Sequence, residues 1–424
     1  MKNLTNHFMP VVGHETLPNG LSLHLVPRPE FHQLVAMVTV DFGARDQVYL
    51  QDGQQVVQPA GLAHFLEHKM FAQPGYDAFT KLSELGDNSN AFTSQTRTSY
   101  FVTSQGYQYA GLKELLNFTQ TPYFDETEIT KEAKIIGQEI DMYQDDPASR
   151  LYRAIMARLY PGDPLAEDIA GTVESVESIN SVVLQHAFDL NYQPKKMDVV
   201  IAGAFDALEV RDIVKDAFTQ QSSADKVAEF VQMPLQPVEV EPLEIDLETI
   251  RNKVAIGQRF FENQVVPTGI DAIKQASALS LVMDLVFSEF SPVYMEWYDE
   301  GLIDDSFSVE FDWERGFAFV NLISETPEPE HLIEVVSAEL NQITARFVEL
   351  SDAFELVKKD ALGRLINKLN SLEEIVTRFE GQTFGGAMLS DEITILQNLS
   401  QVETLAILKT VKTSPVASVI ARPN

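Results

Sequence analysis

The sequence contains no cysteine among its 424 residues. Disulfide bonds, thiolate metal sites and cysteine nucleophiles are therefore excluded, and the absence fits a reducing compartment. Positive charge is also scarce, because 31 Lys and Arg stand against 63 Asp and Glu, for a net charge of −32. Such an acidic chain repels phosphate groups, so we expect neither a nucleic-acid partner nor an anionic membrane partner.

Long apolar segments are missing as well. No run approaches the roughly 18 apolar residues that a membrane span requires, and residues 1–20 lack the basic start and apolar core of a signal peptide. We therefore expect a cytoplasmic protein. The hydrophobic content of 45% is enough to form packed interiors, and the length predicts two or more domains.

One apolar stretch, Gly61 to Met70, carries three residues that suit metal chemistry: His64, Glu67 and His68. Pro59 stands just ahead, where proline suits the first turn of a helix. Residues four apart lie on one helix face, so both imidazoles would point at one place. This H-x-x-E-H arrangement is the inverted zincin motif, with two histidine ligands and a glutamate as general base. The competing interpretation is a buried helix with two hydrogen-bonded histidines.

A catalytic zinc site needs a third protein ligand, which here must be His, Asp or Glu. Residues 125–143 predict a long helix capped by Asp125, and Glu132 and Glu139 lie two turns apart on one of its faces. Glu139 has apolar neighbours and is the candidate ligand. Glu132 is expected to be more exposed and to orient a ligand. Spacing alone leaves open that both are solvent-facing glutamates of an acidic protein.

The chain reads as two α+β halves. Residues 1–222 and 247–424 each combine short strands with amphipathic helices, including one helical segment predicted over residues 353–384. Residues 223–246 contain three prolines and are interpreted as an interdomain linker. The halves could be diverged copies, although their residue identity is too low to establish a repeat.

The histidine motif followed by the Glu132-x6-Glu139 pair resembles the M16 family of zinc peptidases, which includes insulinase, pitrilysin and the mitochondrial processing peptidase. In that family the third ligand ends such a glutamate pair at a long interval after the second histidine. Here Glu139 lies 71 positions after His68. Asn90–Thr93 and Gly137–Ile140 match the family too. Within the family, the sequences of residues 61–71, 90–100 and 137–143 are most similar to the YmfH-like branch of Firmicute bacteria.

The resemblance implies a zinc endopeptidase with one Zn²⁺ per chain, held by His64, His68 and Glu139. Glu67 would be the catalytic base, with Glu132 beside the ligands. It also implies two similar α+β domains, each a mostly antiparallel sheet covered by helices, that form half of a clamshell. Peptides or unfolded segments would be cleaved inside the enclosed chamber.

The resemblance further implies that the substrate pairs with one edge strand and that a second chain takes part. A peptide would add to the sheet edge formed by Asn90, Ala91, Phe92 and Thr93. The second chain would be another copy, giving a homodimer, or an inactive M16 paralogue, giving a heterodimer.

One departure from the family lies in the second half. Active members usually supply an Arg and a Tyr from that half to the substrate carbonyl. Here Trp297 stands about where the Arg would be, Asp304 or Phe307 where the Tyr would be, and Tyr298 is a weak substitute. A partner chain could supply the pair. The alternative function is therefore a non-catalytic or partner-dependent assembly or binding subunit on the same fold. Nothing in the sequence favours a hydrolase of non-peptide substrates.

Overall fold

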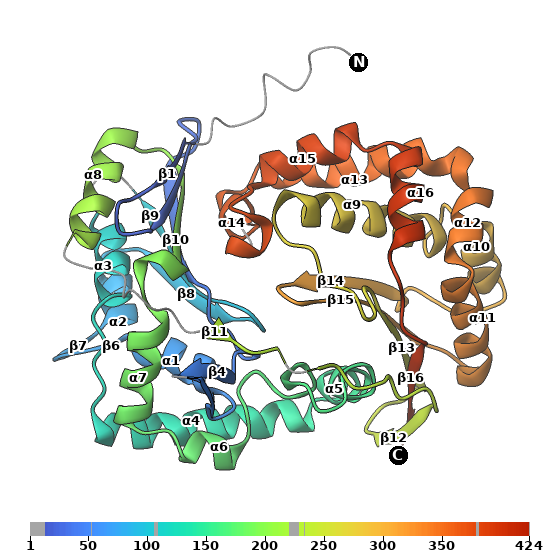
Figure 1. Cartoon of the computed structure of the whole chain (residues 1–424), viewed down its shortest axis with the longest axis horizontal. Helices are drawn as coiled ribbons and strands as arrows, with labels where there is room; N and C mark the ends of the chain where they lie inside the picture. Colours follow the sequence, from blue (N-terminus) through green and yellow to red (C-terminus); the bar gives the residue numbers. More distant parts are fainter. Residues whose placement is uncertain are drawn as a thin grey trace.

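The computed structural model of the chain describes residues 13–51, 53–105, 109–219, 229–232, 234–378 and 381–423, without the side chains of residues 382 and 383. Two main β-sheets occupy the two halves of the molecule, each with its own set of helices (Figure 1). These mostly antiparallel sheets confirm the α+β fold class expected from the sequence. Within the described residues, no helix has both the length and the apolar character needed to cross a membrane.

The two sheets share one topology. The first has the order β1-β2-β10-β3-β9-β8 and the second β12-β16-β13-β15-β14. Only β2 with β10 and β12 with β16 are parallel neighbours within these sheets. Apart from β1, strand order and directions therefore coincide, as expected for diverged copies. The strands span Gly13–Thr16 (β1), Ser22–Pro27 (β2), Gln33–Val40 (β3), Asn88–Thr93 (β8), Thr98–Gln105 (β9), Met197–Gly203 (β10), Leu243–Leu247 (β12), Lys253–Arg259 (β13), Ser308–Glu314 (β14), Phe317–Glu325 (β15) and Ala417–Pro423 (β16).

One face of each sheet is covered by helices from the same half, and each of these layers encloses a large hydrophobic core. The first layer comprises Leu62–Met70 (α1), Ala78–Glu84 (α2), Ala110–Phe118 (α3), Glu126–Asp145 (α4), Val173–Glu177 (α6), Ser181–Asn191 (α7) and Ala207–Phe218 (α8). The second comprises Gly269–Val286 (α9), Pro292–Asp299 (α10), Pro329–Asn341 (α11), Ile343–Glu349 (α12), Phe354–Lys368 (α13), Leu389–Asn398 (α15) and Gln401–Thr410 (α16).

The opposite face of each sheet is contacted by a helix from the other half. Helix α5 (Pro147–Leu159) packs on β13 and β16, and α14 (Leu372–Thr377) packs on β3 and β10. At Gly257 of β13 an added Cβ would lie 2.7 Å from the Leu159 side chain, so glycine permits the close approach of α5. This exchange of helices buries apolar side chains of both halves in shared clusters.

The single helix predicted over residues 353–384 is wrong, because the chain breaks between α13 and α14. The Ser371 side chain caps the new helix by accepting a hydrogen bond from the Glu374 backbone N–H. The break has a clear role, since α13 packs on α9 and α15 of the second half whereas α14 reaches the first sheet.

Short elements complete the fold. The predicted linker 223–246 contains β11 and the start of β12, while residues 223–228 and 233 lie outside the described residues. The remaining elements are the strands Val48–Gln51 (β4), Gln54–Val57 (β5), Ala72–Gln73 (β6), Tyr76–Asp77 (β7) and Glu229–Phe230 (β11), and the 3-10 turns Pro164–Ala166, Pro194–Lys196, Ser351–Ala353 and Gly381–Phe384. Strand β11 pairs with β4, so this segment is tied to the first half.

Candidate metal centre

Helix α1 presents the histidine motif. It begins after Gly61, whose φ of 81° and close approach to Ala170 favour glycine: an added Cβ would lie 2.2 Å from the Ala170 carbonyl oxygen. Pro59 therefore precedes the helix, and its predicted place in the first turn is wrong. Phe65 and Leu66 are fully buried in the first core. Their packing fixes the direction in which the other face of α1 points.

Helix α4 supplies the glutamates. It forms where the sequence predicts it, and the Asp125 side chain accepts hydrogen bonds from two backbone N–H groups of its first turn. Ile136 and Ile140 are buried on the core side. The side chains of Glu132 and Glu139 are 21% and 27% exposed. The expectation that Glu132 is the more exposed of the two is therefore wrong, because it is hydrogen bonded in the site.

Three predicted ligands converge at one place. The Nε2 atoms of His64 and His68 lie 3.9 Å and 3.8 Å from Oε2 of Glu139. One ligand atom from each residue lies within 4.8 Å of the other two, and the described residues contain no other such group of His, Asp or Glu. Ligands bound to a tetrahedral zinc ion at about 2.0–2.1 Å lie roughly 3.4 Å apart. Small side-chain movements would therefore fit these residues to zinc.

The protonation states also suit a metal ion. Burial and the neighbouring charge of His68 lower the pKa of His64 to about 3, so its ring is neutral and ready to bind near pH 7. Burial alone would lower the pKa of His68, but its hydrogen bond to Glu132 and the surrounding carboxylates raise it. The same hydrogen bond, from Nδ1 to Oε1 at 3.0 Å, lowers the pKa of Glu132. It also orients Nε2 of His68 toward Glu139.

Glu67 is buried beside these ligands. The Thr93 hydroxyl donates a 2.5 Å hydrogen bond to its Oε2 atom. Burial raises the pKa of Glu67, and the Thr93 hydrogen bond and the His68 charge offset that effect only in part. A raised pKa suits a carboxylate that must accept and release a proton near neutral pH. The sequence placed Thr93 on the substrate strand but carried no signal for this side-chain contact.

Strand β8 forms the open end of the first sheet and lies against α1. Along it, Asn90 is exposed, Ala91 packs against the first core, and Phe92 packs on the opposite face. Within the described residues, its outer edge has no neighbouring strand. Peptide binding along Asn90–Thr93 therefore stays a prediction, and this edge could accommodate an added strand.

Family comparisons cover both halves of the chain. The model "Insulinase (Peptidase family M16)" matches residues 52–173, and "Peptidase M16 inactive domain" matches residues 178–349. The uncharacterized zinc protease YmfH of Bacillus subtilis (strain 168) is 32% identical over 392 residues, covering 91% of this chain and 90% of that protein. This chain belongs to the M16 peptidase family. The resemblance inferred from the motif is therefore confirmed.

Other relatives of this M16 chain agree. The putative zinc protease AlbF of Bacillus subtilis is 29% identical over 192 residues, which cover 45% of each protein. The crystal structure of a putative M16-like peptidase from Alicyclobacillus acidocaldarius matches with a TM-score of 0.91 at 28% identity, covering 99% of this chain and 100% of that chain. A protease from Helicobacter pylori shares the fold, with a TM-score of 0.78 at 17% identity, covering 98% and 100%.

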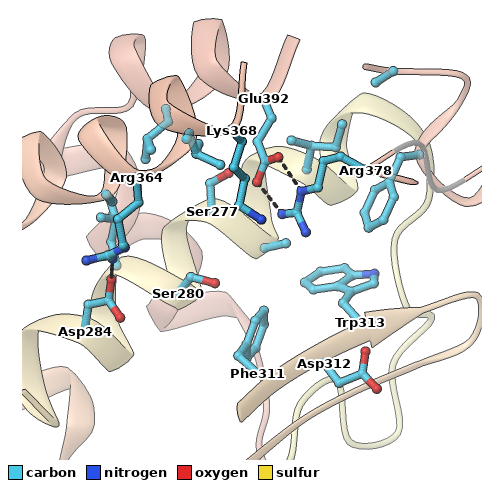
Figure 2. A pocket seen from close by; sticks show the side chains of 18 of the residues that line it. Ser277, Ser280, Asp284, Phe311, Asp312, Trp313, Arg364, Lys368, Arg378 and Glu392 are labelled. Atoms are coloured by element: carbon cyan, nitrogen blue, oxygen red, sulfur yellow. Dashed lines mark hydrogen bonds and ion pairs between the residues drawn. The ribbon is translucent and has the colours of Figure 1, made fainter. Parts of the chain in front are cut away.

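The second half of the M16 chain has a cavity of about 340 Å³ at the place that corresponds to the metal centre (Figure 2). Helix α9 precedes β14 as α1 precedes β8, and α13 precedes α14 as α4 precedes α5. Phe311 and Trp313 line one side of the cavity, and Arg364 and Lys368 project from α13. Arg364 pairs with Asp284 of α9 at 2.5 Å. Among the described residues, this half offers no metal-binding group.

The structure also shows the surroundings of the four residues that the sequence analysis set against the expected Arg and Tyr. Trp297 is buried in the second core. The Tyr298 hydroxyl donates a hydrogen bond to Asp305 at 2.8 Å. Asp304 forms an ion pair within the same half, and Phe307 makes an aromatic contact there. These side chains are thus engaged in packing and local polar contacts.

Proposed function

We propose that this M16 chain is a zinc-dependent endopeptidase that cleaves peptides or unfolded segments. The convergence of His64, His68 and Glu139, with Glu67 next to them, carries the proposal. A buried helix with two hydrogen-bonded histidines explains these facts less well. Such a helix would not need a third ligand-type side chain 3.8–3.9 Å from both rings.

Each residue then has a distinct role. His64, His68 and Glu139 would hold the zinc ion. Zinc, when bound, supplies a Lewis acid that polarises a peptide carbonyl and makes water easier to deprotonate. Glu67 accepts the proton of the attacking water and delivers it to the leaving amine. The Thr93 hydroxyl keeps one oxygen of that carboxylate in place, so the other oxygen is available for the proton.

The substrate would bind along the outer edge of β8, through backbone hydrogen bonds from residues 90–93. Cleavage in a closed chamber would need a second chain, either another copy or an inactive paralogue. Because Trp297 is part of the core, we propose that the partner also supplies the groups that stabilise the substrate carbonyl. We also propose two domains, residues 1–222 and 247–424, joined by the linker 223–246. The proposed location of the protein is the cytoplasm.

The decisive test is Glu67→Gln, which keeps the size of the side chain but removes the base. We expect this variant to bind one zinc ion per chain and to lose cleavage of a panel of quenched fluorescent peptides, assayed with and without the partner chain. Glu128→Gln is the matched control, because Glu128 is exposed on α4 and forms a surface ion pair with Lys131, away from the metal ligands. Unchanged cleavage by Glu67→Gln would refute the assigned role.

The replacement of the expected Arg by Trp297 favours one alternative, a binding or assembly subunit without activity of its own. That alternative predicts one zinc ion per chain and no turnover, even after the partner chain is added. Turnover that depends on both the partner and Glu67 would instead identify this chain as the active member of a pair.

A further inference from the structure

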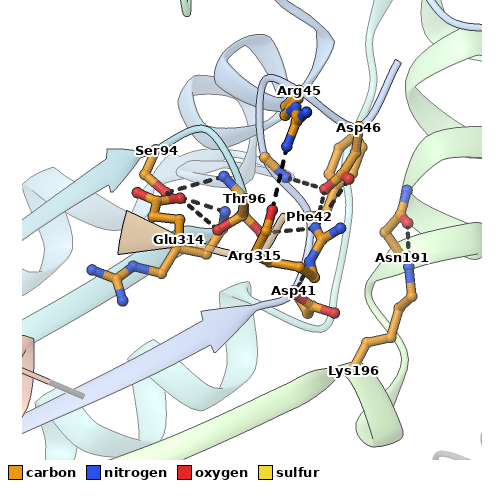
Figure 3. A network of polar contacts seen from close by, with 12 residues as sticks. Asp41, Phe42, Arg45, Asp46, Ser94, Thr96, Asn191, Lys196, Glu314 and Arg315 are labelled. Atoms are coloured by element: carbon orange, nitrogen blue, oxygen red, sulfur yellow. Dashed lines mark hydrogen bonds and ion pairs between the residues drawn. The ribbon is translucent and has the colours of Figure 1, made fainter. Parts of the chain in front are cut away.

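A hairpin from the second half, formed by β14 and β15, brings Glu314 and Arg315 to the turn that holds Ser94 and Thr96 (Figure 3). Glu314, the last residue of β14, accepts two hydrogen bonds through Oε2: one from the Ser94 hydroxyl at 3.0 Å and one from the Thr96 hydroxyl at 2.5 Å. Ser94 directly follows Thr93, whose hydroxyl is bonded to Glu67. One carboxylate of the second half is thus connected to the proposed base through two short contacts and one peptide bond.

The Ser94 hydroxyl organises the turn between β8 and β9. While donating to Glu314, it accepts hydrogen bonds from the backbone N–H groups of Thr96 and Arg97, at 3.2 Å and 3.3 Å. The Ser94 backbone N–H also donates to the Arg97 carbonyl at 2.8 Å. Because hydrogen bonds to a charged acceptor are the stronger kind, Glu314 contributes to the order of this turn.

Arg315 holds the same turn from a second side. Its Nη2 atom donates to both carboxylate oxygens of Asp46, at 3.0 Å and 2.8 Å, and to the Thr96 carbonyl at 3.4 Å, and its Nε atom lies 3.3 Å from Asp41. The Asp46 loop packs directly on the turn, since an added Cβ at Gly43 would lie 2.4 Å from the Thr96 nitrogen. Any shift of the hairpin would therefore be transmitted to the end of β8.

We propose that Glu314 and Arg315 are positioning residues for catalysis: they fix the turn after β8 and so hold the Thr93 hydroxyl on Glu67. This inference rests on the proposed peptidase function. It gives the second half a part in the reaction, although the described residues of that half include no metal-binding group. The metal ligands come from α1 and α4, so the loss of Glu314 should change the alignment of the base and leave zinc affinity intact.

Glu314→Ala, Glu314→Gln and the control Glu310→Ala test the proposal in the full chain, with its partner where turnover requires one. Glu310 lies on the same strand and is exposed. We expect Glu314→Ala to lower kcat by roughly 10-fold or more, because misplacing a reacting group by about 1 Å can cost 100-fold. KM and zinc affinity should stay near the wild-type values. Glu314→Gln keeps an oxygen acceptor and should recover much of kcat, whereas Glu310→Ala should match the wild type.

Two further measurements separate positioning from a general loss of stability. Amide hydrogen exchange of residues 93–97 should accelerate in Glu314→Ala, while exchange in β3 stays unchanged. In a chain that already carries Ser94→Ala and Thr96→Val, Glu314→Ala should have little additional effect on kcat, because its contacts are already gone.

The outcomes distinguish this inference from the proposed function. An unchanged kcat in Glu314→Ala overturns the inference alone, as do fully additive losses or a loss that disappears once rates are corrected for the folded fraction. An active Glu67→Gln overturns the proposed function, and the inference with it.

Discussion

Replacing Glu132 with alanine should weaken zinc binding while leaving the fold intact. The Glu132 carboxylate accepts the hydrogen bond from Nδ1 of His68 at 3.0 Å, and this bond orients Nε2 toward Glu139. Both partners are partly shielded, with 26% of the His68 side chain and 21% of the Glu132 side chain exposed. Without the carboxylate, the ring is free to rotate and its basicity as a ligand falls.

The expected magnitude follows from this geometry. Loss of a partner that orients a metal-binding histidine typically weakens metal affinity about 10- to 100-fold, or roughly 1.4–2.8 kcal/mol. Since about a quarter of each side chain is open to solvent, we expect a value near the lower end, about 10- to 30-fold. Glu132→Gln keeps an oxygen acceptor and should lose less, because it removes the charge but not the orientation.

The pH dependence should change as well. The pKa of His68 is raised because the hydrogen bond and the carboxylates outweigh the effect of burial. Zinc requires the neutral ring, so its affinity falls as the pH decreases through this raised pKa. In the metal-free protein, the protonated pair is stabilising below the ordinary histidine pKa, and this contribution is lost as the pH rises through the raised value. In Glu132→Ala the decline in affinity should begin at a lower pH.

A competition titration with a chromogenic chelator, repeated over a range of pH, separates the orientation effect from proton competition, because protons compete less with zinc for the His68 ring as the pH rises. Glu128→Ala is the matched control on the exposed face of α4. Circular dichroism and thermal unfolding check that the helix persists. Equal zinc affinity in Glu132→Ala and the wild type, or an equal loss in Glu128→Ala, would contradict the assigned role of Glu132.

Three further predictions concern the fold. Burial raises the pKa of Asp198 to about 7, and a hydrogen bond with Ser22 opposes this effect only in part. The free energy of unfolding should therefore fall as the pH rises from about 4 to about 7, by up to roughly 1.4 kcal/mol per pH unit. Denaturant unfolding of Asp198→Asn should show a flatter pH profile, and an unchanged profile would contradict this. Arg315→Met should cost about 3 kcal/mol by leaving the buried Asp46 carboxylate without its cation, and a loss below about 1 kcal/mol in urea unfolding would contradict it. A protease site inserted after Leu235 should yield two fragments that co-elute in size-exclusion chromatography, because α5 and α14 each pack on the sheet of the other half; fragments that separate without denaturant would refute this.

The helix period made part of the metal centre predictable. His64 and His68 share a helix face by spacing alone, and the structure brings them together. Glu139 could not be chosen from spacing, because periodicity groups Glu132 and Glu139 on one face without showing which of them approaches α1. The apolar neighbours of Glu139 favoured it as the ligand, and the family resemblance implied the same choice. The exposure of Glu132 was misjudged because its partner, His68, lies 64 residues away in the sequence.

Contacts between the halves were not predictable. The break before Ser371 and the docking of α14 on the first sheet depend on apolar partners far along the chain. Glu314 could not be distinguished from the other acidic residues of this acidic chain, because its two hydroxyl partners are 218 and 220 residues away in the sequence. Local patterns predict elements and faces, whereas such long-range polar contacts depend on the complete fold.

The helix pairs explain why, among the described residues, the candidate metal-binding group lies in the first half. There α4 presents the Glu139 carboxylate to the histidines of α1, and together these side chains could hold a metal ion. In the second half, α13 instead presents Arg364 and Lys368, and the only carboxylate that the α9 lining offers, Asp284, is already paired with Arg364. The cavity lining contains no histidine and includes three cationic side chains, Arg364, Lys368 and Arg378, so it does not suit a divalent ion. The two halves thus share a strand topology but differ in the charge that this helix presents, since α4 offers a carboxylate where α13 offers cations.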